Sequence, residues 1–246
     1  MTYRYLTDLA AVLRDAGLTV IELDGWRSNG RPKTTGGFDP VGILWHHTGG
    51  TPNTRAYADW MANTGRVDLP APLSQLSIDR AGRWYVQAAG RANHAGSAKA
   101  SGPVPAGDGN ALYLGVECMN TGSEGWTPEQ RDSMVRGGAA LSEHYGYPAA
   151  ANRAHKETSS TGKWDPGLLD MDRFRADISA RMNEEITVRP VDFLRYKLFG
   201  KKQGSRTVAD VLREDNANLR RIAEAVARLE QRPPCNCAGS DTPAPK

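Results

Sequence analysis

Cysteine, long apolar runs and net charge are all scarce in this sequence, and each scarcity excludes a class of protein. Three cysteines among 246 residues, Cys118, Cys235 and Cys237, are too few for a disulfide framework. No apolar run approaches the roughly 20 residues that a membrane-spanning helix needs. A formal charge of +3 is too small to indicate nucleic-acid binding by itself. With 39% hydrophobic and 24% charged residues, the composition is that of a soluble globular protein.

The N-terminus also lacks the pattern of a signal peptide. Asp8, Arg14 and Asp15 interrupt its apolar residues, which follow a helical spacing. This spacing predicts an amphipathic helix over residues 4–16, and Gly17 follows where a helix C-cap belongs.

The small net charge is unevenly distributed along the chain. Residues 186–246 hold 12 Lys/Arg and 7 Asp/Glu, whereas residues 1–185 hold 19 and 21. A basic C-terminal region on a near-neutral body indicates attraction to an anionic partner, such as a cell wall, a membrane surface or a nucleic acid. The alternative is a solvated helix with an ordinary excess of basic residues.

Short apolar runs separated by turn residues predict a mixed α/β fold. Strands are expected at residues 41–47, 74–78, 84–88 and 112–118, and the turn 79–82 joins the middle two as a hairpin. Helices are expected at residues 51–64, 127–144 and 172–184. Thr127 and Gln130 open the second helix as N-cap and capping-box partner. This order predicts one α/β domain with a mixed central sheet flanked by helices and a C-terminal helical appendage.

The chain divides into three regions by composition. Residues 1–185 are expected to form the main α/β domain, including the N-terminal helix and loop 1–37. Residues 186–231 are a basic helical region with a heptad-like apolar row, which predicts a cell-wall targeting element, a short coiled coil or a helix docked on the main domain. Residues 232–246 are rich in proline and small polar residues and are expected to be disordered.

Histidine and aspartate at two points of the chain predict a metal site. His46 and His47 end the strand 41–47, and because neighbouring strand residues face opposite ways, only one of them can face a given site. His155 and Asp165 lie in a long Gly/Ser/Thr-rich stretch, and such loops are uncommon unless functional. One strand-end histidine, His155 and Asp165 would give zinc three ligands and leave a fourth position for water. On spacing alone, structural histidines and an Asp-Pro turn remain the more common explanation.

Four segments occur in an order that resembles the zinc-dependent N-acetylmuramoyl-L-alanine amidases of the Amidase_2 group, which includes peptidoglycan recognition proteins. The segments are residues 43–48 (ILWHHT), 92–96 (ANHAG), 114–117 (LGVE), and His155 followed by 163–167 (KWDPG). The resemblance covers roughly residues 38–182. The opening strings Gly-Trp-Arg and Gly-Gly-Phe-Asp-Pro, and the string Arg-Ala-Asn-His-Ala-Gly, are similar to endolysins of phages that infect actinobacteria.

The resemblance implies one zinc ion per catalytic domain, held by His46, His155 and Asp165. It also implies that Glu117 moves protons and that Lys163 stabilises the oxyanion while the amide bond between N-acetylmuramic acid and L-alanine is hydrolysed.

Three further residues are expected to bind substrate: His94, Asn93 and Asn120. For His94, a buried histidine that fixes its loop is an equal alternative. His47 is expected to face away from the metal and be structural, and Cys118 is expected to be a small buried hydrophobic residue.

One departure from the family leaves other functions open. Many catalytic members carry a tyrosine on the strand before the Ile78-Asp79-Arg80 turn, and residues 73–79 contain none. A peptidoglycan-binding recognition module without turnover is therefore one alternative. A cytoplasmic amidase that recycles soluble muropeptides is a separate alternative, which the basic C-terminal region disfavours because a soluble substrate needs no wall anchor.

The preferred interpretation is a phage endolysin. It would be made in the host cytoplasm without a signal peptide and reach the cell wall after the membrane is permeabilised. Peptidoglycan is the expected partner, with self-association through the C-terminal helix, and neither nucleic-acid binding nor a transmembrane segment is expected.

Overall fold

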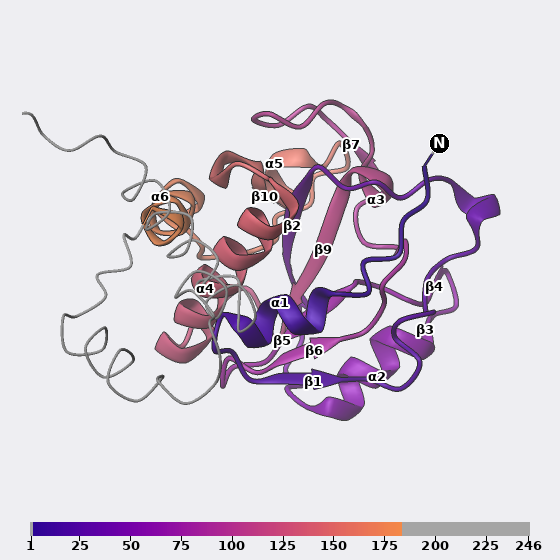
Figure 1. Ribbon diagram of the computed structural model, residues 1–246, viewed down its shortest axis with the longest axis horizontal. Coiled ribbons are helices and arrows are strands. Elements are labelled where there is room, and N and C mark those ends of the chain that lie inside the picture. The colour runs from indigo at the N-terminus through magenta and orange to yellow at the C-terminus, as the bar shows by residue number, and fades with distance from the viewer. Residues whose placement is uncertain (1, 184–246) are drawn as a thin grey trace, which may run out of the picture. The chain divides into compact units, whose positions relative to one another are not determined.

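The computed structural model describes residues 2–183, which fold around a six-stranded mixed sheet (Figure 1). Across the sheet the strands are β1 (Val20–Glu22), β6 (Trp84–Val86), β5 (Leu76–Ile78), β9 (Tyr113–Cys118), β2 (Gly42–His47) and β10 (Asn152–Ala154). Two small strand pairs lie outside it: β3 (Gly65–Arg66) with β4 (Leu69–Pro70), and β7 (Ser97–Ala98) with β8 (Gly107–Asp108).

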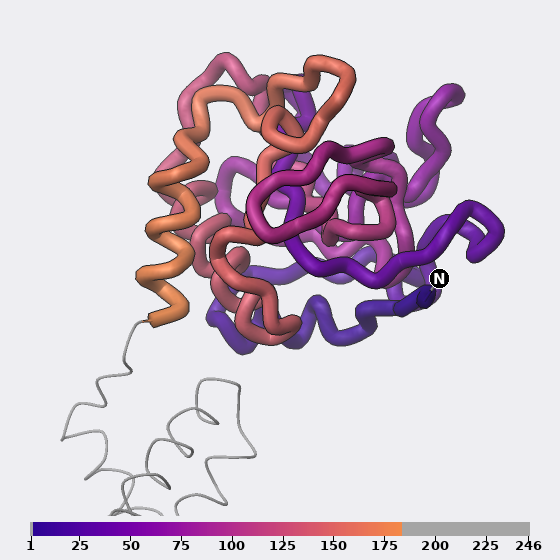
Figure 2. Tube along the Cα trace, turned by 90° about the horizontal axis from the view of Figure 1, so that it is seen from above, coloured from indigo at the N-terminus to yellow at the C-terminus, as the bar shows by residue number. Residues whose placement is uncertain are grey.

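Six α-helices accompany the sheet in the described residues. They are α1 (Leu9–Asp15), α2 (Arg55–Asn63), α3 (Gly109–Leu112), α4 (Pro128–Tyr145), α5 (His155–Thr158) and α6 (Met171–Met182). Short 3-10 helices occupy Lys33–Thr35 and Ala149–Ala151. The orange trace of α6 runs along one side of these residues in Figure 2. The predicted mixed sheet flanked by helices is confirmed.

Parallel pairing dominates the centre of the sheet. β2 pairs in parallel with both β9 and β10, and β9 pairs in parallel with β5. β6 returns antiparallel to β5, as the predicted hairpin requires, and β1 pairs in parallel with β6. The carboxyl ends of β5, β9, β2 and β10 therefore meet at one edge, which is where open α/β sheets place their ligand sites.

The two faces of the sheet are covered differently. Trp45 and Trp84 face the helices α1, α4 and α6, and the ring of Trp45 packs edge-on against Phe174 of α6 at 5.0 Å. Side-chain alternation puts His46 on the opposite face. There α2 covers only part of the sheet, where its buried residues form a second apolar cluster with Tyr85. Beside that cluster, the same face carries His46 and Glu117 at the carboxyl edge of the sheet.

Two adjacent glycines, Gly137 and Gly138, let α4 pack closely against the sheet and against α6. A Cβ added at Gly137 would lie 2.3 Å from Cζ2 of Trp84, and one at Gly138 would lie 2.9 Å from Cδ1 of Ile178. Glycine weakens a helix by about 1 kcal/mol relative to alanine. Close packing therefore explains a pair of residues that local propensity disfavours.

The start of α4 confirms one part of the sequence interpretation and corrects another. The Thr127 side chain accepts a hydrogen bond from the Gln130 backbone N–H, as expected for an N-cap. The predicted capping box is wrong, because the Gln130 side chain donates to the carbonyls of Ile78 and Met119 instead. Gln130 is fully buried, so its amide satisfies the ends of two central strands rather than its own helix.

Two predicted helices begin later than expected. The first begins at Leu9, because Tyr3 and Arg4 pair with Phe38 in an extended conformation. The second begins at Arg55, because the Thr54 side chain caps it. The predictions for residues 186–246 lie outside the described residues. No helix among residues 2–183 has the length and hydropathy needed to cross a membrane.

We expect the substitution Gly137→Ala to lower the free energy of unfolding by about 1–3 kcal/mol, because the added methyl group must displace the Trp84 ring. Helix propensity alone would give the opposite sign. Denaturant unfolding in the parent and in a Trp84→Phe background separates the two effects, since the smaller ring should reduce the cost. A stabilised Gly137→Ala protein would contradict the packing explanation.

Candidate functional site

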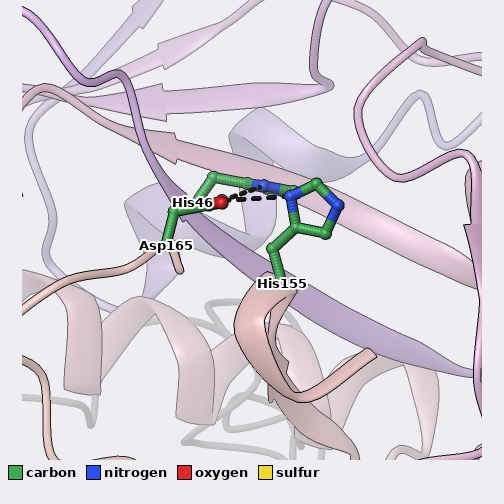
Figure 3. Close-up of side chains that lie close together, drawn as sticks. All are labelled: His46, His155 and Asp165. Atoms are coloured by element: carbon green, nitrogen blue, oxygen red, sulfur yellow. Dashed lines mark hydrogen bonds and ion pairs between the residues drawn. The ribbon is translucent and has the colours of Figure 1, made fainter. Parts of the chain in front are cut away.

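Three side chains from different parts of the chain converge at the carboxyl edge of the sheet (Figure 3). His46 is the second-last residue of strand β2, and His155 follows directly after β10. Because these strands are adjacent and parallel, the two imidazole rings lie 4.6 Å apart. Asp165 arrives on the loop before α6, and its Oδ2 atom lies 2.8 Å from His46 Nδ1 and 3.1 Å from His155 Nδ1.

The donor set fits a zinc ion. The candidate ligand atoms of His46, His155 and Asp165 all lie within 4.8 Å of one another, and the three residues are buried. Ligand atoms about 2.0–2.2 Å from zinc in tetrahedral geometry are about 3.3 Å apart, which is close to the distances from Asp165 to the two histidines. Two imidazoles and one carboxylate leave one coordination position for water or substrate.

The electrostatics of these groups favour the protonation states that bind a metal. Burial lowers the pKa of His46 to about 4, although the hydrogen bond with Asp165 opposes this shift. Burial alone would raise the pKa of Asp165, but hydrogen bonds from His155 and His46 outweigh it and hold that pKa below its usual range. At neutral pH the cluster therefore contains a neutral His46 and an ionised Asp165, as zinc ligands must be.

A lysine and the second strand-end histidine anchor the loop that carries Asp165. The Lys156 backbone N–H donates to the Asp165 carbonyl at 2.7 Å, and Lys156 Nζ donates to the carbonyls of Pro166 and Leu169 at 2.9 Å each. On the other side, the Gly167 N–H donates to Nδ1 of His47 at 2.9 Å. His47 therefore points away from His46 and takes part in structure, as alternation predicts. No sequence pattern marks Lys156 for its role.

Glu117 lies beside the cluster in a central strand. It is in register with His46 of β2 on one side and with Ser77 of β5 on the other. Burial raises the pKa of Glu117 to about 8, with a further rise from the charge of Asp165 and an opposing effect of Lys163. Within residues 2–183, neither Glu117 Oε2 nor Ser77 Oγ has a hydrogen-bond partner. The exposed Lys163 thus acts electrostatically on a half-buried glutamate whose Oε2 atom is out of contact with solvent.

Tyr57, a tyrosine that the sequence did not single out, also interacts electrostatically with Glu117. Burial raises the pKa of Tyr57, and the charge of Glu117 raises it further. The Tyr57 ring stacks on Trp60 with 5.5 Å between centroids and an interplanar angle of 7°. Both belong to α2. Their spacing of three residues, which places two aromatic rings on the same side of a helix, was the sequence signal that could have drawn attention to Tyr57.

The three predicted substrate-binding residues have different surroundings. His94 joins the cluster, with its Nδ1 atom 3.1 Å from His46 Nε2. Asn93 Nδ2 donates to the Pro70 carbonyl at 2.7 Å. Asn120 is fully buried, and its Oδ1 accepts from the Gly122 N–H at 2.7 Å. Of the three, the structure therefore brings only His94 into contact with a candidate ligand, while Asn93 ties its loop to β4 and Asn120 holds its own loop.

Cys118 is fully buried, as expected, and the hydrophobic core surrounds it on the face opposite to Glu117. Trp164 is the most exposed aromatic residue near the cluster, with 56% of its surface accessible, and its ring lies 4.3 Å from that of His47.

Comparison with solved structures finds related proteins at low sequence identity. An endolysin N-acetylmuramoyl-L-alanine amidase, LysCS from Clostridium intestinale, is 20% identical over 65% of this chain and 95% of its own, with a TM-score of 0.49. An AmpD derivative is 21% identical over 65% and 93%, with a TM-score of 0.48. The PlyG catalytic domain is 18% identical over 70% and 98%, with a TM-score of 0.49. Among the curated proteins, none matches this chain.

A family model gives the assignment. The model described as N-acetylmuramoyl-L-alanine amidase matches residues 36–168, which is more than half of the chain. The matched segment contains His46, His155 and Asp165 together with Glu117 and Lys163. This chain therefore belongs to the N-acetylmuramoyl-L-alanine amidase family.

Proposed function

We propose that this chain is a zinc-dependent amidase that hydrolyses the bond between N-acetylmuramic acid and L-alanine in peptidoglycan. The observation that supports this most strongly is the convergence of His46, His155 and Asp165, with Asp165 Oδ2 at 2.8 and 3.1 Å from the two histidine nitrogens. Zinc in such a set acts as a Lewis acid on a carbonyl oxygen and lowers the pKa of water.

Glu117 has the properties of the group that moves the proton. It is half-buried beside the ligand set, and its pKa of about 8 is close to the pH at which the reaction would run. Its carboxyl group would take a proton from the attacking water and give it to the alanine nitrogen as the C–N bond breaks. The products would be a free lactyl carboxylate and a free amino group on L-alanine.

Lys163 has the properties of an oxyanion-stabilising group. Its side chain is exposed, and its positive charge reaches Glu117. An ammonium group so placed would face the negative charge that develops on the carbonyl oxygen during attack. One well-placed donor of this kind contributes about 3–4 kcal/mol of transition-state stabilisation.

We also propose a phage endolysin as the biological setting, on the sequence strings similar to endolysins of actinobacterial phages. In that setting residues 186–231, which lie outside the described residues, would bring the enzyme to the wall through their basic charge.

The reaction is tested on purified peptidoglycan and on a soluble muropeptide, with detection of new amino groups on L-alanine and of new reducing sugars. We expect new amino groups only, from both substrates. Wall binding without product would indicate a recognition module, and cleavage of the soluble fragment alone would indicate a recycling enzyme. New reducing sugars would contradict an amidase.

The metal is tested by elemental analysis and by the substitution His155→Ala. We expect one zinc per chain in the parent, loss of activity on chelation and recovery with zinc. His155→Ala should bind zinc poorly, because two ligands remain of three. His144→Ala removes a histidine on α4, outside the ligand set, and should behave as the parent. Activity that survives chelation would refute the zinc site.

Glu117→Gln should lower kcat by about 10²-fold or more, because the amide cannot accept the proton. It should also stabilise the chelator-treated protein. The folded carboxyl group keeps its proton up to about pH 8, whereas the unfolded one ionises above about 4.5, so stability falls as pH rises through this window. Thermal unfolding from pH 5 to 9 should show that fall in the parent and less of it in Glu117→Gln. The exposed Glu129→Gln is the control, and parental turnover by Glu117→Gln would contradict the role.

Lys163→Met should lower kcat by about 10²-fold and leave zinc content and thermal stability unchanged, because the side chain is exposed. Lys163→Arg should retain part of the activity, since it keeps the charge. Steady-state kinetics on a soluble muropeptide measures both. If Lys163→Met turns over at the parental rate, oxyanion stabilisation comes from another group.

A further inference from the structure

The second ring nitrogen of His46 has a specific partner. His46 Nε2 lies 3.1 Å from Nδ1 of His94, and the two rings meet edge-on with centroids 5.2 Å apart. His46 thus has Asp165 at Nδ1 and His94 at Nε2. A histidine held at both nitrogens has its ring orientation fixed.

The surrounding chain is built to place His94 there. Asn110 Oδ1 accepts hydrogen bonds from the backbone N–H groups of His94 and Ala95 at 2.8 Å each, which fixes the loop. The His94 ring lies against the backbone of β9 at Gly115, where an added Cβ would be 2.7 Å from His94 Cγ. Only glycine leaves room for the ring at this point of the strand.

The hydrogen bond between His46 and His94 can run in either direction, and a proton on Nδ1 of His46, which lets that nitrogen donate to the ionised Asp165, would prevent it from binding a metal. A bond between two neutral imidazoles needs one N–H and one lone pair. When zinc takes the Nδ1 lone pair between Asp165 and His155, the single proton of neutral His46 must lie on Nε2, and Nδ1 of His94 can accept a hydrogen bond from it. Metal-bound histidines commonly donate their other N–H to an acceptor in this way.

We propose that His94 is a positioning residue for the metal site: by accepting a hydrogen bond from His46 Nε2, it directs the Nδ1 lone pair of His46 toward the zinc position. Asn110 and Gly115 serve this arrangement by placing the His94 ring. The inference rests on the proposed zinc function. It differs from the two roles expected from the sequence, which were substrate binding and fixing of the local loop.

Two substitutions with opposite hydrogen-bonding capacity test the proposal. His94→Leu fills space but offers no acceptor, whereas the Oδ1 atom of asparagine in His94→Asn can occupy the place of the imidazole Nδ1. Zinc affinity is measured by competition with a chromophoric chelator. We expect zinc to bind about 10–100-fold more weakly to His94→Leu, and His94→Asn to recover most of that loss. Equal affinity in the parent and in both variants would overturn the proposal, as would equal losses in both variants.

The tautomer itself can be observed by nitrogen-15 NMR of the histidine rings in the zinc-loaded protein. We expect a proton on Nε2 of His46 and none on Nδ1 in the parent. A protonated Nδ1 in the loaded parent would overturn the proposal.

Gly115→Ala tests the same point without changing any hydrogen-bonding group. The added methyl group should move the His94 ring and weaken zinc binding as His94→Leu does. Thermal unfolding in chelator shows whether each variant is folded, and if Gly115→Ala is not, the two His94 variants decide. A parent that binds no zinc would refute the proposed function, whereas a zinc-binding parent matched by all three variants would refute only the role of His94.

Discussion

The site depends on the parallel register of three neighbouring strands. The pairing of β2 with β9 sets His46 beside Glu117, and the pairing of β2 with β10 brings His155 to the same edge. A shift of one residue in either pairing would turn a whole set of side chains to the other face. Because the strands are buried on both faces, this register is strongly specified, and the ligand geometry is a consequence of packing.

The opposite facing of His46 and His47 connects the two sides of the sheet. His46 lies on one face of the sheet, while His47, on the other face, accepts a hydrogen bond from the Gly167 N–H and so holds the loop that returns Asp165 to the site. One dipeptide therefore supplies a candidate ligand and the anchor of another ligand. The same sheet must also be packed tightly on its helical side. Gly137 of α4 meets that need by leaving room for Trp84, and Gly138 by leaving room for Ile178 of α6.

Local sequence signals were sufficient for the central strands and long helices, because apolar runs and caps are local properties. They missed β1 and β10, whose three residues each carry little apolar signal and are fixed by pairing with distant strands. For the site, spacing alone could not choose between zinc ligands and structural histidines, and family resemblance supplied the residues. The supporting contacts of Lys156, Asn110 and Tyr57 arise only when the chain is folded, so no local pattern could predict them.

Glu117, beside the cluster, is costly for folding when taken alone. Burial raises the pKa of Glu117 to about 8, the charge of Asp165 adds to that rise, and Glu117 Oε2 has no partner in the described part of the chain. Buried carboxyl groups without partners are destabilising, and a core selected only for stability would replace them with apolar residues. In this protein the packing of the surrounding strands keeps Glu117 in place despite that free-energy cost. A carboxyl group with so strongly raised a pKa at a ligand-binding edge is typical of catalytic sites. It favours catalysis over recognition alone.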